Sequence, residues 1–282
     1  MRCLEGAAYS ARVSARAETE TERTGDASTL PESGALRFLK VPGQITVWFW
    51  AIKILTTAMG ESTSDYLVHR FNPYLVVISG FVLFVIALAI QFTVQRYSPW
   101  VYWLAVLMVA VFGTMAADVL HIQFGVPYVA SAAALAVALA VIFTVWHASE
   151  RTLSIHSIYT RKREVFYWAA VLATFAMGTA TGDLTAYTAH LGFLTSGLLF
   201  AALFALPAIA YRFFNLNAIL AFWIAYVLTR PLGASFADWL GKSHRAGGVQ
   251  LGDGPVTAVL FIAIVACVAY VAHTREDQVR SA

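Results

Sequence analysis

The chain has 282 residues, of which 59% are hydrophobic and only 12% are charged, and its mean hydropathy is +0.68. An ordinary soluble domain carries about 25% charged residues, so these few charges could not cover so much apolar surface in water. The composition therefore indicates a helical protein that crosses a bilayer several times. A formal net charge of +3 gives no sign of nucleic-acid binding, and two cysteines, Cys3 and Cys267, do not suggest a disulfide framework.

Residues 1–38 differ from everything that follows them. They are polar, small and charged, and they contain no apolar run that could contribute to a core. No apolar segment typical of a secretory signal follows the first residues. We therefore expect a disordered polar tail.

Eight segments after this tail are long and apolar enough to cross a bilayer, which takes about 20 residues. They cover approximately residues 44–67, 73–95, 100–120, 127–146, 164–187, 191–212, 216–240 and 255–273. The first, fifth and seventh are the most polar, because they carry the motifs described below. The predicted fold class is all-α integral membrane, with about eight transmembrane helices.

Basic residues divide unequally between the two faces that eight spans create. One face receives Arg37, Lys40, Arg96, Arg151, Arg161, Lys162, Arg163, Arg212, Arg275 and Arg280. The other face receives Arg70, Lys242 and Arg245. Because cytoplasmic loops are enriched in lysine and arginine, both termini are predicted to be cytoplasmic.

Two short motifs recur in the same order in both halves of the chain. The run MGESTSD, which ends at Asp65, aligns with MGTATGD, which ends at Asp183. Further along, GTMAAD, which ends at Asp118, aligns with GASFAD, which ends at Asp238. Two matches in one order indicate an internal duplication of a four-helix unit. Because each unit has an even number of spans, the two copies should be parallel and related by a pseudo-two-fold axis along the membrane normal.

The duplication defines the predicted domain organisation. The regions are a disordered tail (1–38), a first four-helix repeat (39–150), a cytoplasmic linker (151–160), a second four-helix repeat (161–275) and a cytoplasmic tail (276–282).

Four aspartates fall near the extracytoplasmic ends of the first, third, fifth and seventh spans: Asp65, Asp118, Asp183 and Asp238. An aspartate at the centre of a spanning helix costs about 2.5–3.5 kcal/mol on insertion scales. Such a cost usually persists where the group faces water, a cation or another ionisable group. Each aspartate alone could simply end its helix at the interface, but four at repeated positions favour a function. We predict that they form a cation-binding site together with Glu61.

Hydroxyl groups and histidines near the aspartates are further candidate ligands. The hydroxyls of Ser62, Thr63, Thr179 and Thr181 add oxygen atoms, which suit a hard cation or protons. His69 and His121 follow an aspartate by four and three residues, a spacing that places each pair on one face of a continuing helix. Such histidines would favour a transition metal. The alternative is that both are ordinary loop residues.

Two basic residues interrupt the apolar spans. Lys53 precedes Glu61 by eight residues, and Arg230 precedes Asp238 by eight. As counter-charges they would neutralise the acids when no cation is bound, or they would form structural ion pairs that close the bundle. Pro231 follows Arg230 directly and predicts a kink or a break in the seventh span.

Two segments carry a resemblance to a known family. KVPGQITVWFWAIKILTTAMGESTSDYL and SIHSIYTRKREVFYWAAVLATFAMGTATGDL resemble bacterial multi-pass membrane proteins of a functionally uncharacterised family described as membrane-anchored. The similarity covers nearly everything after residue 38. It implies a bacterial inner-membrane location and supplies no substrate or mechanism.

The leading hypothesis is a secondary cation transporter, which we expect to move a divalent metal in a proton-coupled way. No nucleotide-binding motif is present, so ATP is not expected to drive it. We expect no cofactor apart from a transported metal ion. The expected partners are the lipid bilayer, a small cation and protons, but no nucleic acid, and a homo-oligomer is left open.

Two alternatives belong to other functional classes. A non-transporting scaffold or sensor would pair its acids with Lys53 and Arg230 to hold the helices together. A membrane-embedded enzyme would use paired carboxylates as acid and base. The sequence contains neither G-x-S-x-G nor H-E-x-x-H, so we do not expect an enzyme.

Overall fold

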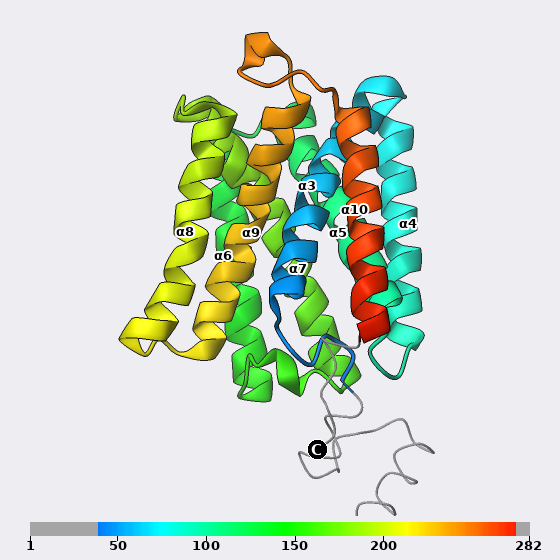
Figure 1. Cartoon of the computed structure of the whole chain (residues 1–282), viewed down its shortest axis with the longest axis vertical. Coiled ribbons are helices and arrows are strands. Elements are labelled where there is room, and N and C mark those ends of the chain that lie inside the picture. Colours follow the sequence, from blue (N-terminus) through cyan, green and yellow to red (C-terminus); the bar gives the residue numbers. More distant parts are fainter. Residues whose placement is uncertain (1–38, 275–282) are drawn as a thin grey trace, which may run out of the picture.

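The computed structural model describes residues 39–274, and all regular elements in this range are helices (Figure 1). The tails predicted for residues 1–38 and 276–282 lie outside it. Its eight long helices are α3 (Val47–Arg70), α4 (Pro73–Thr93), α5 (Pro99–Asp118), α6 (Tyr128–Glu150), α7 (Arg161–Asp183), α8 (Gly192–Phe214), α9 (Ala218–Gly241) and α10 (Asp253–Thr274). The predicted all-helical fold is confirmed.

Prolines and side-chain caps set several helix starts. Pro73 and Pro99 stand at the first positions of α4 and α5, where a missing N–H costs no hydrogen bond. The Asn72 side chain accepts a hydrogen bond from the N–H of Tyr74 at 3.0 Å, and Asn217 caps the start of α9 in the same way. These short, capped connections reverse the chain quickly, so successive helices run antiparallel.

Four helices form the centre of the bundle. α3 packs against α5, α5 against α7, α7 against α9, and α9 back against α3, which closes a ring. The four run in the same direction because an antiparallel outer helix follows each of them (Figure 1). Each outer helix packs on the next central helix along the chain: α4 on α5, α6 on α7, α8 on α9, and α10 on α3.

Seven of the eight helices, all except α3, are long and apolar enough to cross a membrane. α3 is as long as α9, at 24 residues, but it carries polar side chains such as Lys53 and Glu61 that are buried within the bundle. Polar residues in membrane helices normally face the interior of the bundle in this way. The chain therefore has the architecture of a multi-pass helical membrane protein.

Glycines allow the central helices to approach one another closely. Each central helix presents a glycine to the next helix of the ring, and the pairs are Gly60–Ala110, Gly113–Phe175, Gly178–Arg230 and Gly233–Thr57. A Cβ on Gly60 would lie 2.5 Å from Ala110 Cβ and 2.8 Å from the Ala110 carbonyl carbon, so a side chain there would push the helices apart. The same contact recurs around the whole ring. The bundle therefore has pseudo-four-fold symmetry, which includes the predicted pseudo-two-fold relation between the halves.

Of the kink or break predicted at Pro231, the break is wrong. α9 is one continuous helix from Ala218 to Gly241, with the proline inside it. Pro231 packs against Gly178 and Gly182 of α7, where the absence of side chains leaves room for the ring.

Candidate functional site

Equivalent positions on the four central helices, taken every fourth residue, form five rows across the bundle. Residues four positions apart lie on one inclined stripe of a helix. The rows are given in order from the side of the bundle on which the described chain both starts and ends. They are Phe49, Tyr102, Tyr167 and Phe222; Lys53, Val106, Val171 and Tyr226; Thr57, Ala110, Phe175 and Arg230; Glu61, Thr114, Thr179 and Ala234; and Asp65, Asp118, Asp183 and Asp238. The first four rows are buried except for Phe222, which is partly buried. We call the last row, where the central helices finish, the acid end, and the opposite side the terminal end.

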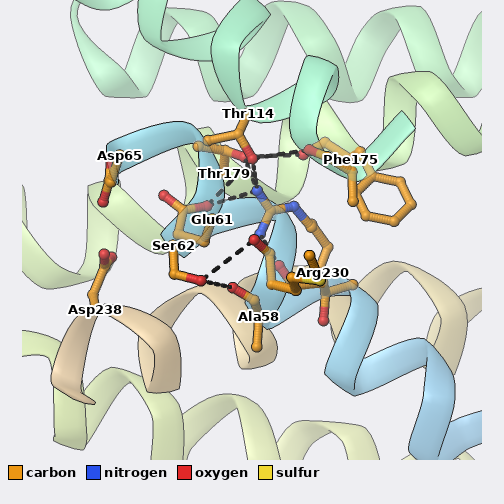
Figure 2. A network of polar contacts seen from close by, with 12 residues as sticks. Ala58, Glu61, Ser62, Asp65, Thr114, Phe175, Thr179, Arg230 and Asp238 are labelled. Carbon is orange, nitrogen blue, oxygen red and sulfur yellow. Dashed lines mark hydrogen bonds and ion pairs between the residues drawn. The ribbon is translucent and has the colours of Figure 1, made fainter. Parts of the chain in front are cut away.

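Arg230 lies at the centre of the polar network (Figure 2). Its Nη2 atom donates to Glu61 Oε2 at 2.6 Å, to Thr179 Oγ1 at 2.7 Å and to Thr114 Oγ1. Its Nη1 atom donates to the carbonyl oxygen of Thr57 at 3.2 Å. The guanidinium group of α9 thus contacts side chains from all three other central helices.

Three carboxylates gather beside this network. Oxygen atoms of Glu61, Asp65 and Asp238 lie within 4.8 Å of one another, and Figure 2 shows Asp65 and Asp238 turned toward each other. Lys242, directly after α9, forms an ion pair with Asp65, and its Nζ atom lies 3.7 Å from Asp238 Oδ1. Burial alone would lower the pKa of Lys242, but the charges of Asp238 and Asp65 outweigh that effect and raise it. Lys242 is therefore a fixed positive charge over two of the acids.

Asp118 and Asp183 complete the last row from α5 and α7. Both are partly buried, and neither side chain forms a hydrogen bond or an ion pair with another residue in the range 39–274. Each is followed directly by a π-helical turn, η2 (Val119–Gln123) after Asp118 and η4 (Leu184–Thr188) after Asp183. Because π-helical turns occur frequently at functional sites, these two unpaired carboxylates are the best candidates for contacting a ligand.

Acids outnumber bases along the axis. Five carboxylates, those of Glu61 and the four aspartates, lie in the last two rows, and Arg230 and Lys242 are the bases that pair with them. Even if Lys53 from deeper in the bundle is included, five formal negative charges face three positive ones, an excess of two. Buried or partly buried charge of this kind has to be offset by protons or by a bound cation.

The four predicted hydroxyl ligands have different surroundings. Only Thr179 belongs to the Arg230 network. Ser62 Oγ accepts a hydrogen bond from Thr257 at 3.0 Å, and Thr181 donates to a carbonyl of its own helix at 2.8 Å. The buried Oγ1 atom of Thr63 has no hydrogen-bond partner in the described part of the chain.

The two predicted histidine ligands each approach a backbone carbonyl. His69 Nδ1 lies 2.7 Å from the carbonyl oxygen of Asp65, and His121 Nδ1 lies 2.8 Å from that of Val126. The His121 ring also stacks on Tyr128, with 3.6 Å between the ring centroids. Neither histidine belongs to the cluster of Glu61, Asp65 and Asp238. Their role in metal binding stays a prediction.

Lys53 does not act as a counter-charge to Glu61 in the structure. It is fully buried, and its Nζ atom has no hydrogen-bond partner among residues 39–274. The atom lies 3.9 Å from the centroid of the Phe175 ring and 4.3 Å from that of Tyr226. Eight residues along a helix correspond to a rise of about 12 Å, which a lysine on the same helix does not bridge here. Arg230, from the neighbouring helix, pairs with Glu61 instead.

Buried contacts close the terminal end. Lys40 Nζ forms a 2.7 Å ion pair with Glu164 Oε2, and Gln91 Nε2 donates to the other carboxylate oxygen at 3.2 Å. In the first row of the axis, the hydroxyl oxygens of Tyr102 and Tyr167 lie 2.5 Å apart. The acid end and the terminal end therefore differ in both charge and packing.

The four helix pairs that build the ring correspond to four matches with one known protein family. The chain matches the family described as Repeat of Unknown Function (DUF347) in four segments, residues 48–97, 101–152, 166–216 and 221–277, which cover well over half of its length. The chain belongs to the DUF347 family. No curated protein and no solved structure matches it. Each DUF347 segment contains one central helix and the outer helix after it, so the matches subdivide each predicted four-helix repeat into two helix pairs.

All four DUF347 repeats share one register, which aligning the two halves alone did not reveal. In each repeat an aromatic residue directly precedes a tryptophan. A glycine follows ten residues after that tryptophan, and an aspartate follows five residues after the glycine. The four sets are Trp50, Gly60 and Asp65; Trp103, Gly113 and Asp118; Trp168, Gly178 and Asp183; and Trp223, Gly233 and Asp238. In this register Thr114 is equivalent to Glu61. The register would therefore have identified Thr114 as a hydrogen-bond partner of Arg230, which the sequence analysis missed.

Proposed function

We propose that this DUF347 protein is a secondary transporter that moves a divalent cation across a bacterial inner membrane in exchange for protons, with both termini in the cytoplasm. The main support for this proposal is an excess of acidic over basic side chains inside the bundle. Four parallel helices contribute five carboxylates, whereas the basic side chains are those of Arg230, Lys242 and the deeper Lys53. A carboxylate can hold either a proton or a cation, which links the two fluxes.

The donor atoms favour a hard or intermediate divalent ion. Carboxylate and hydroxyl oxygens dominate the acid end, and such sets suit Mg²⁺, Ca²⁺ or Mn²⁺. Asp118 and Asp183 are the first contacts, because their carboxylates are not engaged by other side chains. Glu61, Asp65 and Asp238 then join the ion as their oxygens move away from Arg230 and Lys242.

The arrangement of the two ends supports alternating access. The acid end holds the ion site, while the Lys40–Glu164 pair and the aromatic row close the terminal end. An ion released to the terminal side would require those contacts to open while the acid end closes. Helix rearrangements of this kind around a fixed site are common in repeat-built transporters.

Elemental analysis of whole cells tests the proposal. Cells without the protein, cells with the wild type and cells with Asp118→Asn/Asp183→Asn are challenged with a panel of divalent metals at equal membrane abundance. The double variant leaves the ion pairs of Arg230 and Lys242 in place, so it should fold. The content of one metal should change with the wild type and not with the double variant. A double variant that shifts the metal content as strongly as the wild type would refute the proposed site.

Glu150→Gln serves as the matched control. It also replaces a carboxylate by an amide, but Glu150 lies at the terminal end and pairs with Arg163 at 2.8 Å. This variant should shift the metal content as the wild type does.

One observation favours a second candidate, a scaffold without transport. Glu61 pairs with Arg230 and Asp65 with Lys242, so two acids hold neighbouring helices together as the scaffold hypothesis requires. Asp118 and Asp183 do not fit it, because they hold no side chain in the described part of the chain. A scaffold predicts that Asp118→Asn/Asp183→Asn has no effect on any ion. We also propose that the protein acts as a transporter and not as an enzyme.

A further inference from the structure

Lys53 is a buried base without an acceptor. Its side chain is fully buried and its Nζ atom makes no hydrogen bond to any described residue. The aromatic faces of Phe175 and Tyr226 lie against it, at 3.9 and 4.3 Å from Nζ to the ring centroids. Aromatic faces attract an ammonium ion, but they do not replace the hydrogen bonds that it loses on burial. The surroundings of Lys53 therefore stabilise its ammonium form only weakly.

Arg230 lies against the same ring as Lys53. The carbon atom of its guanidinium is 5.6 Å from the Phe175 centroid. Two positive groups thus share one aromatic ring in the interior, where repulsion between charges is strong. A guanidinium does not lose its proton in proteins, whereas a buried lysine readily does. Lys53 is therefore the member of this pair that can respond by changing its charge.

Few other titratable groups surround Lys53. Those that its own helix and the neighbouring helices contribute within about two helical turns of its level are Glu61 on α3, Tyr102 on α5, Glu164 and Tyr167 on α7, Arg230 and Tyr226 on α9, and Cys267 on α10. α4 carries no charged residue. Both carboxylates in this set are paired with another base, Glu61 with Arg230 and Glu164 with Lys40. The charge on Lys53 consequently depends on how well Glu61 compensates Arg230.

We propose that Lys53 carries one of the protons that are exchanged for the cation, an inference that rests on the proposed function. When a cation draws the Glu61 carboxylate away, Arg230 loses its counter-charge and repels the Lys53 ammonium. Nζ then releases one proton and keeps the electron pair as a neutral amine. When the cation leaves, Glu61 returns to Arg230 and the Nζ lone pair takes up one proton. The exchange is one proton at Lys53 for each cation bound.

Proton release on cation binding tests this role. Purified full-length protein in detergent and weak buffer is titrated with Mn²⁺ as the probe, and bound Mn²⁺ and released protons are counted together. Lys53→Met should bind Mn²⁺ and release about one proton fewer per ion than the wild type. Lys162→Met, which removes a lysine side chain that is 63% exposed, should release as many protons as the wild type. Equal release by Lys53→Met and the wild type would overturn the inference.

A second variant covers the case in which Lys53→Met does not fold. Lys53→Arg keeps the positive charge but cannot release a proton near neutral pH. It should release about one proton fewer per Mn²⁺ bound, and its Kd for Mn²⁺ should rise about tenfold or more because the charge remains. Unchanged release and affinity in Lys53→Arg would contradict the inference while leaving the proposed transport intact. A wild-type protein that binds no Mn²⁺ would overturn both for this ion.

Discussion

Arg230 and Glu61 join the last repeat of the ring to the first, with Nη2 of the arginine 2.6 Å from Oε2 of the glutamate and neither side chain more than 5% exposed. The two charges compensate each other inside the bundle, and the pair holds Glu61 beside Asp65 and Asp238. This pair thus links the last central helix to the first and places a carboxylate at the proposed ion site.

Removing the arginine should destabilise the protein strongly. Arg230→Met leaves Glu61 buried without a counter-charge, which typically costs about 3–5 kcal/mol. Glu61→Gln/Arg230→Met should recover most of this loss, because no buried charge is then left alone. The free energy of unfolding of the detergent-solubilised protein measures both effects.

An exposed ion pair provides the comparison for Arg230. Lys162 lies 3.0 Å from Glu150, and its side chain is 63% exposed. Lys162→Met should change the free energy of unfolding by only about 0–1 kcal/mol, as is usual for surface pairs. An Arg230→Met protein as stable as Lys162→Met would show that the buried pair does not hold the ring together.

The glycine contacts should tolerate no side chain. Gly60→Ala places a methyl group 2.5 Å from Ala110 Cβ and 2.8 Å from backbone of α5, so the two helices have to separate. Overpacking of this kind costs about 1–3 kcal/mol. We expect a lower melting temperature in detergent.

Gly182 of α7 is the matched control for Gly60. A methyl group there would meet its nearest neighbour at 3.8 Å, an ordinary contact distance. Since alanine also favours a helix by about 1 kcal/mol over glycine, Gly182→Ala should be neutral or stabilising. If both substitutions lower the melting temperature equally, the close approach at Gly60 is not what limits the side chain.

Lys242 should compete with the cation for Asp65 and Asp238. Lys242→Gln removes the positive charge that pairs with Asp65, so binding of Mn²⁺ should tighten by about tenfold, or about 1.4 kcal/mol. Isothermal titration calorimetry on the purified protein measures this change. Weaker binding by Lys242→Gln would mean that the lysine positions the acids instead of competing with the ion.

The effect of Lys242 should be independent of pH near neutrality. Its pKa is raised in the folded protein, so its charge, and the stability that its ion pairs contribute, are fully present below its ordinary pKa of roughly 10.4 and are lost only above it. The ratio of Mn²⁺ affinities between Lys242→Gln and the wild type should therefore stay level from about pH 7 to 9. A ratio that falls steadily over this range would show that Lys242 loses its proton there.

Helix positions and the acid row could be predicted from the sequence because both depend on local information. Each apolar run had to be long enough to span a bilayer, and Asp65, Asp118, Asp183 and Asp238 stood out against apolar surroundings. The four-fold register was also present in the sequence, but the two motif alignments paired only the first repeat with the third and the second with the fourth.

The partners of the buried bases could not be predicted in the same way. Lys53 and Glu61 share a helix, so their spacing suggested a pair, yet the close packing of α3 against α9 brings Arg230 to Glu61 and leaves Lys53 between aromatic rings. Contacts between helices depend on their relative rotation and depth, which the spacing of residues within a helix does not determine.

The most direct test of the central claim is ion flux in liposomes that contain only the purified protein. A pH gradient is imposed, and a trapped indicator reports entry of Mn²⁺, Mg²⁺ or Ca²⁺ into vesicles with the wild type or Asp118→Asn/Asp183→Asn. We predict that the gradient drives at least one of these ions across the membrane with the wild type and that the double variant, folded and present in equal amount, does not move it. A wild-type protein that moves none of them, or a double variant that moves the same ion equally fast, would contradict the account.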